Sequence, residues 1–233
     1  MTTKILSDAR KYLVTFLEGK QNQYETTHLW RQDWQHLVLH SLRVEAYVLR
    51  ILAREQHPLT ESGVRPLQLA AILHDIGRLE KTENHAKTGA NVARRWLQNY
   101  PGGSLPQSDI EAVTDMIADH SNKNSGETDF RKAVLKDADI LDEIGAMSIF
   151  MASNWVDVQS PFFFYQLQKR LIDVEVPYCD RQLSLLNTKA AKEILNKKKV
   201  FIEHFIAQLD DEIQTDRDFE LPGFTSPAYK DYP

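Results

Sequence analysis

Cysteine is nearly absent from this sequence, since Cys179 is the only one among 233 residues. A single cysteine excludes an internal disulfide and a structural zinc site made of thiolates alone. Long apolar runs are missing too, because no stretch approaches the roughly 20 apolar residues that a transmembrane helix needs. Residues 1–10 contain no apolar run that resembles a signal peptide. These absences lead us to expect a cytoplasmic protein.

An excess of positive charge is also missing. The formal net charge is −5, with 28 Lys and Arg against 33 Asp and Glu. This balance argues against broad affinity for nucleic acids or membrane surfaces, although it is compatible with a local basic pocket. We find no internal repeat and no low-complexity segment, so a repeat architecture is not expected. The sequence leaves the oligomeric state open.

Alternation of apolar and polar residues with a period of two is almost absent, whereas apolar spacings of three and four recur along the chain. This pattern predicts an all-α fold. The expected helices cover residues 5–17, 37–51, 66–77, 82–100, 108–120, 129–152, 162–173 and 184–213. Pro66 is expected as a first helical residue, Ser108 with Glu111 as a capping box, and Thr128 or Asp129 as an N-cap. We predict one helical domain over residues 1–213 and an extended tail over 214–233.

The dipeptide His74–Asp75 ends an apolar run that begins at Leu67. A charged pair in such a place is costly unless something binds it. His40 continues the apolar stripe of its own predicted helix and is therefore expected to face inward. The alternative for His40 is a core histidine that is satisfied by one hydrogen bond.

Two more histidines adjoin apolar stripes. His120 ends a stripe that runs through Ile117, and His85 opens a helix face that continues through Gly89. A glycine on the face of His85 would let another helix or a ligand approach closely, and simple packing is an equal alternative.

The segment 136–142 contains three aspartates, and clustered acidic residues usually lie on the solvent-exposed face of a helix. Asp139 aligns with the apolar positions of its helix, while Asp137 and Asp142 are expected on the solvent side. An inward aspartate needs a metal, a base or a strong set of hydrogen bonds.

Nitrogen and oxygen donors on several helices suit one or two divalent metals. Neighbouring helical residues point about 100° apart, so His74 and Asp75 reach one metal from the edge of a buried face. That geometry leaves a second oxygen of Asp75 free to bridge to another metal. Three or four protein ligands leave coordination positions for water and substrate, as in a catalytic site.

The segments 40–44, 74–77 and 136–142, in this order, resemble the HD-domain superfamily of metal-dependent phosphohydrolases. The resemblance covers about residues 33–153, the predicted motif-bearing core, and implies a multi-helix HD bundle with its metal site in the core. Residues 120–121 and 145–146 are most similar to small bacterial members that resemble nucleotide pyrophosphohydrolases. Many relatives carry a basic residue at the position of Ile140, so a phosphate contact expected there is missing.

The resemblance implies His40, His74, Asp75 and Asp139 as primary ligands, and His85 and His120 as ligands of a second metal. The cofactor would be one or two ions of Mn, Mg, Fe, Co, Ni or Zn per chain. The substrate would be a small phosphorylated molecule such as a nucleotide, and neither a nucleic acid nor a membrane is expected as a partner.

A divalent metal lowers the pKa of a bound water and neutralises charge on a phosphoryl oxygen. Asp75 is the candidate catalytic residue, which would orient that water, accept its proton or bridge two metals. Basic residues that could contact phosphate are Arg43, Arg78, Lys81, Lys123 and Lys136. Arg43 and Lys136 are the predicted substrate-binding residues, with the alternative that Arg43 pairs with a nearby carboxylate. Substrate is expected to enter between the turn after Asp75 and the loop 121–128.

Two other functions remain compatible with the sequence. The same ligand types occur in HD-like oxygenases with a dinuclear iron site, and metal identity with oxygen dependence would distinguish them. A non-catalytic regulatory module that keeps a structural metal is the second alternative.

Overall fold

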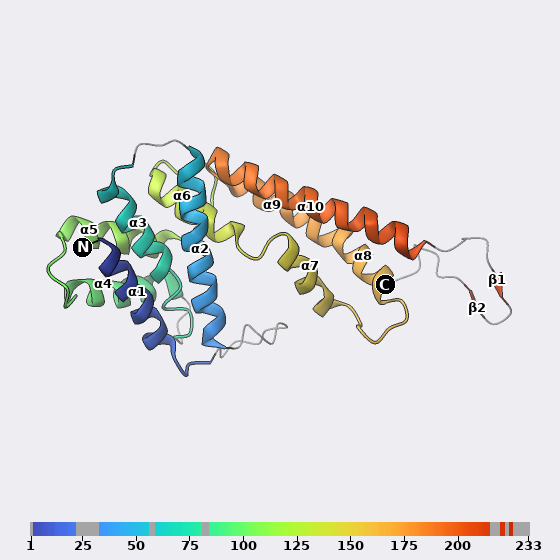
Figure 1. Ribbon diagram of the computed structural model, residues 1–233, viewed down its shortest axis with the longest axis horizontal. Helices are drawn as coiled ribbons and strands as arrows, with labels where there is room; N and C mark the ends of the chain where they lie inside the picture. Colours follow the sequence, from blue (N-terminus) through green and yellow to red (C-terminus); the bar gives the residue numbers. More distant parts are fainter. Residues whose placement is uncertain are drawn as a thin grey trace. The chain divides into compact units, whose positions relative to one another are not determined.

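The computed structural model describes residues 2–21, 33–55, 59–80, 84–214, 220–221 and 224–225 (Figure 1). Over these residues the fold is all-α, as predicted, and its only strands are the two-residue pair β1 (Glu220–Leu221) and β2 (Phe224–Thr225). None of the helices in the described ranges is long and apolar enough to cross a membrane. Most of the predicted C-terminal tail lies outside the described residues.

Two compact units make up the chain. The first contains the residues up to Asp142 together with 185–192, and the second contains 143–184 and the residues from Glu193 onward. The sequence predicted one helical domain over residues 1–213, and the number of independent domains stays a prediction.

Among the described residues, six helices lie wholly within the first unit: α1 (Thr2–Leu17), α2 (Trp34–Glu55), α3 (Glu61–Leu73), α4 (His85–Gln98), α5 (Gln107–Asp119) and α6 (Phe130–Leu141). The helix α3 lies in the middle, because it contacts α1, α2, α5 and α6. Its last turn is therefore apolar on every side, and residues 69–73 are all buried. This central position explains why α3 carries the dipeptide His74–Asp75 into the interior of the unit.

The second unit contains α7 (Ala146–Ala152), the short 3-10 turn η2 (Ser153–Trp155), α8 (Phe163–Arg170), the π-helical turn η3 (Leu171–Glu175), α9 (Val176–Leu185) and most of α10 (Lys189–Ile213). Polar side chains link α10 to α8 and α9. Gln168 Nε2 donates to Asp210 Oδ1 at 2.8 Å, and Lys199 Nζ donates to Asp180 Oδ1 at 2.6 Å.

Several predicted helix boundaries are wrong. The helix expected over 129–152 ends at Leu141, because Glu143 and Gly145 take positive φ angles of 61° and 98°. The helix α3 begins five residues before Pro66, so Pro66 lies inside the helix and not at its first position, and it cannot donate a backbone hydrogen bond there. The helix α5 follows Pro106 and has no side-chain cap, so the capping box predicted at Ser108 is absent.

Other boundaries differ by less or agree. Asp129 caps α6 as predicted, since its side chain accepts from the backbone N–H of Arg131. The last predicted helix is split, because α9 ends at Leu185 and α10 begins at Lys189. Within the second unit, α8 begins at Phe163, close to the prediction. The predicted start of the fourth helix at Thr82 lies outside the described residues, and α4 itself begins after the N-cap Asn84.

Candidate metal centre

Five helices bring the six predicted ligands together. His40 comes from α2, His85 from the start of α4, His120 from the C-cap of α5, and Asp139 from α6. His74 and Asp75 follow directly on α3 and are buried. The centre therefore lies where the helix ends of the first unit meet, which needs contacts between residues up to about a hundred positions apart.

Two glycines, Gly77 and Gly89, allow the turn after Asp75 to pack closely against the beginning of α4. A Cβ atom on Gly77 would lie 2.5 Å from both the amide nitrogen of Gly89 and the carbonyl oxygen of His85. On the other side, a Cβ on Gly89 would lie 3.2 Å from the carbonyl oxygen of His74. Gly89 is thus approached by another part of the backbone, which brings His85 beside Asp75.

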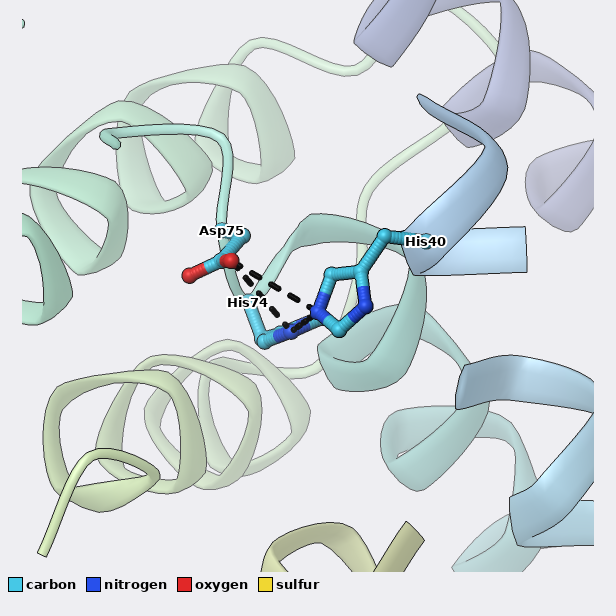
Figure 2. Close-up of side chains that lie close together, drawn as sticks. All are labelled: His40, His74 and Asp75. Carbon is cyan, nitrogen blue, oxygen red and sulfur yellow. Dashed lines mark hydrogen bonds and ion pairs between the residues drawn. The ribbon is translucent and has the colours of Figure 1, made fainter. Parts of the chain in front are cut away.

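The first group of donors surrounds the Nε2 atom of His40. This atom lies 3.1 Å from His74 Nε2, 3.3 Å from Asp139 Oδ1 and 3.6 Å from Asp75 Oδ2. Figure 2 shows the His40 ring reaching from its helix toward His74 and Asp75. His74 Nε2 lies 3.7 Å from Asp139 Oδ1. Four side chains from three helices thus point their donor atoms at one another.

The second group surrounds the other oxygen of Asp75. Asp75 Oδ1 lies 3.4 Å from His85 Nε2 and 3.3 Å from His120 Nε2. This oxygen is buried and has no hydrogen-bond partner among the parts of the chain that are described. Asp75 therefore lies between the two groups, with one oxygen facing each.

The outer ring nitrogens show how the histidines are oriented. His74 Nδ1 donates to the carbonyl oxygen of Ala71 at 2.8 Å, and His120 Nδ1 donates to that of Ile117 at 2.7 Å. His40 Nδ1 donates to Asp142 Oδ2 at 2.7 Å. Because Nδ1 of each of these rings faces a carbonyl or carboxylate oxygen, Nε2 is the ring atom that faces the centre. Ser121 Oγ lies 3.0 Å from His85 Nε2.

Electrostatics at the centre favour cations. Burial raises the pKa of Asp75, but Arg78, His74 and His120 outweigh it and hold that pKa well below its ordinary value. Burial also lowers the pKa of His40, but Asp139 and Asp142 outweigh it and raise the pKa to about 10. The pKa of His85 falls to about 4, chiefly through burial. The carboxylates stay ionised at neutral pH, and a divalent ion would compete with the proton of His40.

These residues fit a divalent metal. Three groups of three donors each lie within 4.8 Å of one another, namely His40 with His74 and Asp75, His74 with His120 and Asp139, and Asp75 with His85 and His120. A buried carboxylate oxygen without a partner, facing two imidazole nitrogens, is the arrangement that a bound cation would satisfy. Imidazole and carboxylate donors together suit first-row transition metals.

The two predicted substrate-binding residues, Arg43 and Lys136, contact carboxylates that are not among the predicted metal ligands. Arg43 donates to both carboxylate oxygens of Asp142, at 2.7 and 2.9 Å, as the alternative from the sequence proposed. Lys136 is buried, and its ammonium group lies 2.7 Å from both Asp119 and Glu127. The structure thus gives both cations partners other than the metal ligands, and their substrate contacts stay predictions.

The other basic candidates differ from these two. Arg78 Nε donates to Asp75 Oδ2 at 2.6 Å, and Lys123 Nζ forms an ion pair with Asp139. Lys81 lies outside the described residues.

The expected solvent-facing positions of Asp137 and Asp142 are wrong, because both side chains are buried. Asp137 accepts from the backbone N–H groups of Asn187 and Thr188, at 2.9 and 2.7 Å, just before α10. Asp142 orients His40. The sequence contained a signal for both Asp142 and Ser121, since Asp142 follows Asp139 by three residues and Ser121 belongs to the segment 120–121 that carries part of the resemblance, but it gave neither a role.

The chain is similar to known proteins both in sequence pattern and in structure. The family model described as the HD domain matches residues 37–144. A predicted HD superfamily hydrolase from an uncultured Thermotogales bacterium has a similar structure, with TM-score 0.60, 20% identity and coverage of 89% of this chain and 92% of that chain.

Two other solved structures are similar. YpgQ of Bacillus subtilis in complex with ADP has TM-score 0.59 and 22% identity, over 91% of this chain and 97% of that chain. A protein of Listeria innocua has TM-score 0.56 and 18% identity over the same shares. No curated protein matches the chain. The structural likenesses show a shared fold over nearly the whole length.

Proposed function

We propose, from the match of the HD-domain family model to residues 37–144, that this chain is a metal-dependent phosphohydrolase. The observation that supports this most is the position of Asp75, with one buried oxygen near His40 and His74 and the other near His85 and His120. His40, His74, Asp75 and Asp139 would hold one metal, and His85 and His120 with Asp75 a second. The native metal among Mn, Mg, Fe, Co, Ni and Zn stays open.

The reaction would be attack of water on phosphorus. The bound metal supplies a water of lowered pKa and neutralises phosphoryl charge. The oxygen of water forms a bond to phosphorus, the bond to the leaving oxygen breaks, and the proton of the water leaves to solvent or a nearby base. The low pKa of Asp75 makes it a weak proton acceptor, so its role would be to orient the water and bridge the two donor groups.

The substrate would be a nucleotide or a related small molecule with a phosphoester or phosphoanhydride bond. ADP bound to the similar Bacillus subtilis YpgQ supports a nucleotide. The net charge of −5 speaks against nucleic acids as general partners. A cytoplasmic location accords with this substrate and remains part of the proposal.

The test is a panel of nucleoside mono-, di- and triphosphates, assayed with Mn²⁺, Mg²⁺, Co²⁺ and Ni²⁺ on the purified chain. We expect release of phosphate or pyrophosphate, with ¹⁸O from labelled water in the product and without a phospho-enzyme. Metal analysis should give about one or two divalent ions per chain. No hydrolysis across the panel would reject the proposal, and an activity that requires O₂ would favour the iron oxygenase.

A further inference from the structure

Two cations already touch the carboxylates proposed as ligands. Arg78, in the turn that follows α3, donates from Nε to Asp75 Oδ2 at 2.6 Å. Lys123, in the loop that follows α5, forms an ion pair with Asp139 Oδ2. The side chains of Arg78 and Lys123 are 46% and 23% exposed, whereas the carboxylate side chains are 2% and 13% exposed. The buried carboxylate of Asp75 and the largely covered carboxylate of Asp139 are therefore each paired with a long side chain that reaches in from the surface.

This pairing separates Arg78 and Lys123 from the other basic residues near the centre. Arg43 forms two bonds to Asp142, which is not among the proposed ligands. Lys136 has a side chain that is 1% exposed, between Asp119 and Glu127. Of these four cations, two combine contact with a proposed ligand and access to solvent. Arg78 lies in the turn after Asp75, and Lys123 lies in the loop 121–128. The sequence analysis predicted that substrate enters between this turn and this loop.

Resting on the proposed function, we propose that Arg78 and Lys123 compete with the metal for Asp75 and Asp139 and, once displaced, bind the phosphate of the substrate. Arg78 contacts Asp75 Oδ2, the oxygen that faces His40, and Lys123 contacts Asp139 Oδ2, beside the Oδ1 that faces His40 and His74. A divalent ion held by these carboxylates would neutralise their negative charge and repel the guanidinium and ammonium groups a few ångströms away. Both side chains are long enough to turn toward an incoming phosphate, for which guanidinium and ammonium are strong donors.

The competition couples metal to phosphate. A phosphate that holds Arg78 and Lys123 away from the carboxylates removes competitors of the metal, so it raises metal affinity. By reciprocity, the metal raises phosphate affinity by the same factor. The residues that balance the negative charge of Asp75 and Asp139 would thus be those that recognise substrate.

The experiment compares Arg78→Gln and Lys123→Gln with the parent chain by calorimetric titration. Full-length protein stripped with EDTA and dialysed is titrated with Mn²⁺, and Mn²⁺-loaded protein is titrated with inorganic phosphate. Both variants should bind Mn²⁺ about tenfold more tightly and inorganic phosphate about tenfold more weakly, the scale of one charge-assisted hydrogen bond. Lys132→Gln is the matched control, because Lys132 lies 2.8 Å from Asp115 and touches no proposed ligand in the contacts described.

The opposite signs of the two effects make the test strict. Unchanged or weaker Mn²⁺ binding, or unchanged phosphate binding, overturns the role of the residue concerned. Should Lys123→Gln fail to fold, Lys123→Arg, which keeps the charge, must retain parent-like phosphate binding, and Arg78→Gln still carries the competition test. Failure of the proposed function would appear separately, as a parent chain that binds Mn²⁺ and hydrolyses no phosphoester.

Discussion

Asp75 shows how one residue can organise the whole centre. It is buried, its Oδ2 accepts from Arg78, and its Oδ1 has no hydrogen-bond partner in the described parts of the chain. An unpartnered buried carboxylate oxygen is destabilising on its own. The nearby Nε2 atoms of His85 and His120 carry lone pairs or a proton, so a cation between them and Asp75 would relieve this cost. The residue therefore fits a role in binding more readily than a role in the fold alone.

Asp75→Asn is expected to abolish activity and leave the fold intact. The substitution keeps the volume and removes the charge that a metal needs, so kcat should fall by about a hundredfold or more and metal content should drop. Hydrolysis assays, metal analysis and circular dichroism measure the three effects. Asp173→Asn is the control, because Asp173 is half exposed and pairs with Lys169 in α8. Full activity with full metal content in the Asp75 variant would contradict the assignment.

Cys179 is expected to be unreactive in the folded chain. Its side chain is 1% exposed, and burial, assisted by Glu175 and Asp180, raises its thiol pKa from 9.0 to about 11. A raised pKa leaves less thiolate at pH 8, by about a hundredfold. Reaction with a disulfide reagent at pH 8 should therefore be slow in native protein, accelerate as pH rises toward 11, and be complete within minutes in denaturant. Fast reaction of the native protein at pH 8 would show that α9 opens readily.

At the scale of elements, sequence periodicity predicted the helices better than their ends. The stripes of α1 and α2 follow apolar residues at spacings of three and four, and these helices appear where predicted. Helix ends depend on local backbone geometry that has no periodic signal. The predicted sixth helix ends at Leu141, because Asp142 is extended and Glu143 and Gly145 take positive φ angles. Pro66 lies within α3, because the chain is already helical from Glu61. The solvent-facing prediction for Asp137 failed because its partners, Asn187 and Thr188, lie some fifty residues away.

The contact between the turn after α3 and the first turn of α4 is expected to need Gly77. In Gly77→Ala, the new methyl group would lie 2.5 Å from backbone atoms of Gly89 and His85, which cannot move independently of α4. We expect the free energy of unfolding to fall by about 2–4 kcal/mol and metal affinity to fall with it, because His85 is displaced. Denaturant unfolding and a Mn²⁺ titration measure these effects.

Gly63→Ala, in the preceding helix α3, provides the control for this prediction. A Cβ on Gly63 would meet only the flexible side chain of Leu59, at 3.3 Å. Alanine is the better helix former, so stability should stay or rise by up to about 1 kcal/mol. Equal losses in both variants would show that the Gly77 effect is general to glycine replacement in this segment and unrelated to the close backbone approach.

At the scale of the whole molecule, the six candidate ligands span from His40 to Asp139, and all belong to the first unit. Sequence reasoning grouped them through inward-facing positions and the ordered resemblance to HD domains. It could not find Asp142 as the partner of His40 or the glycine contact, because both depend on how α2, α4 and α6 are placed in space. The second unit contains none of these ligands, so metal should act on the first unit directly.

Chelation should therefore destabilise the two units unequally. Removal of metal with EDTA takes away a ligand that binds only folded protein, which costs about 2.7 kcal/mol when free metal had been at a hundred times its Kd. In hydrogen exchange followed by mass spectrometry, peptides covering residues 74–80, 84–92 and 117–123 should exchange faster after chelation, because they carry the ligands and their neighbours. Peptides of α8 and α9 should exchange at the same rate with and without EDTA. Re-addition of Mn²⁺ should restore protection, and His74→Ala should be insensitive to both treatments. Equal acceleration over both units, or none near the ligands, would contradict a metal centre confined to the first unit.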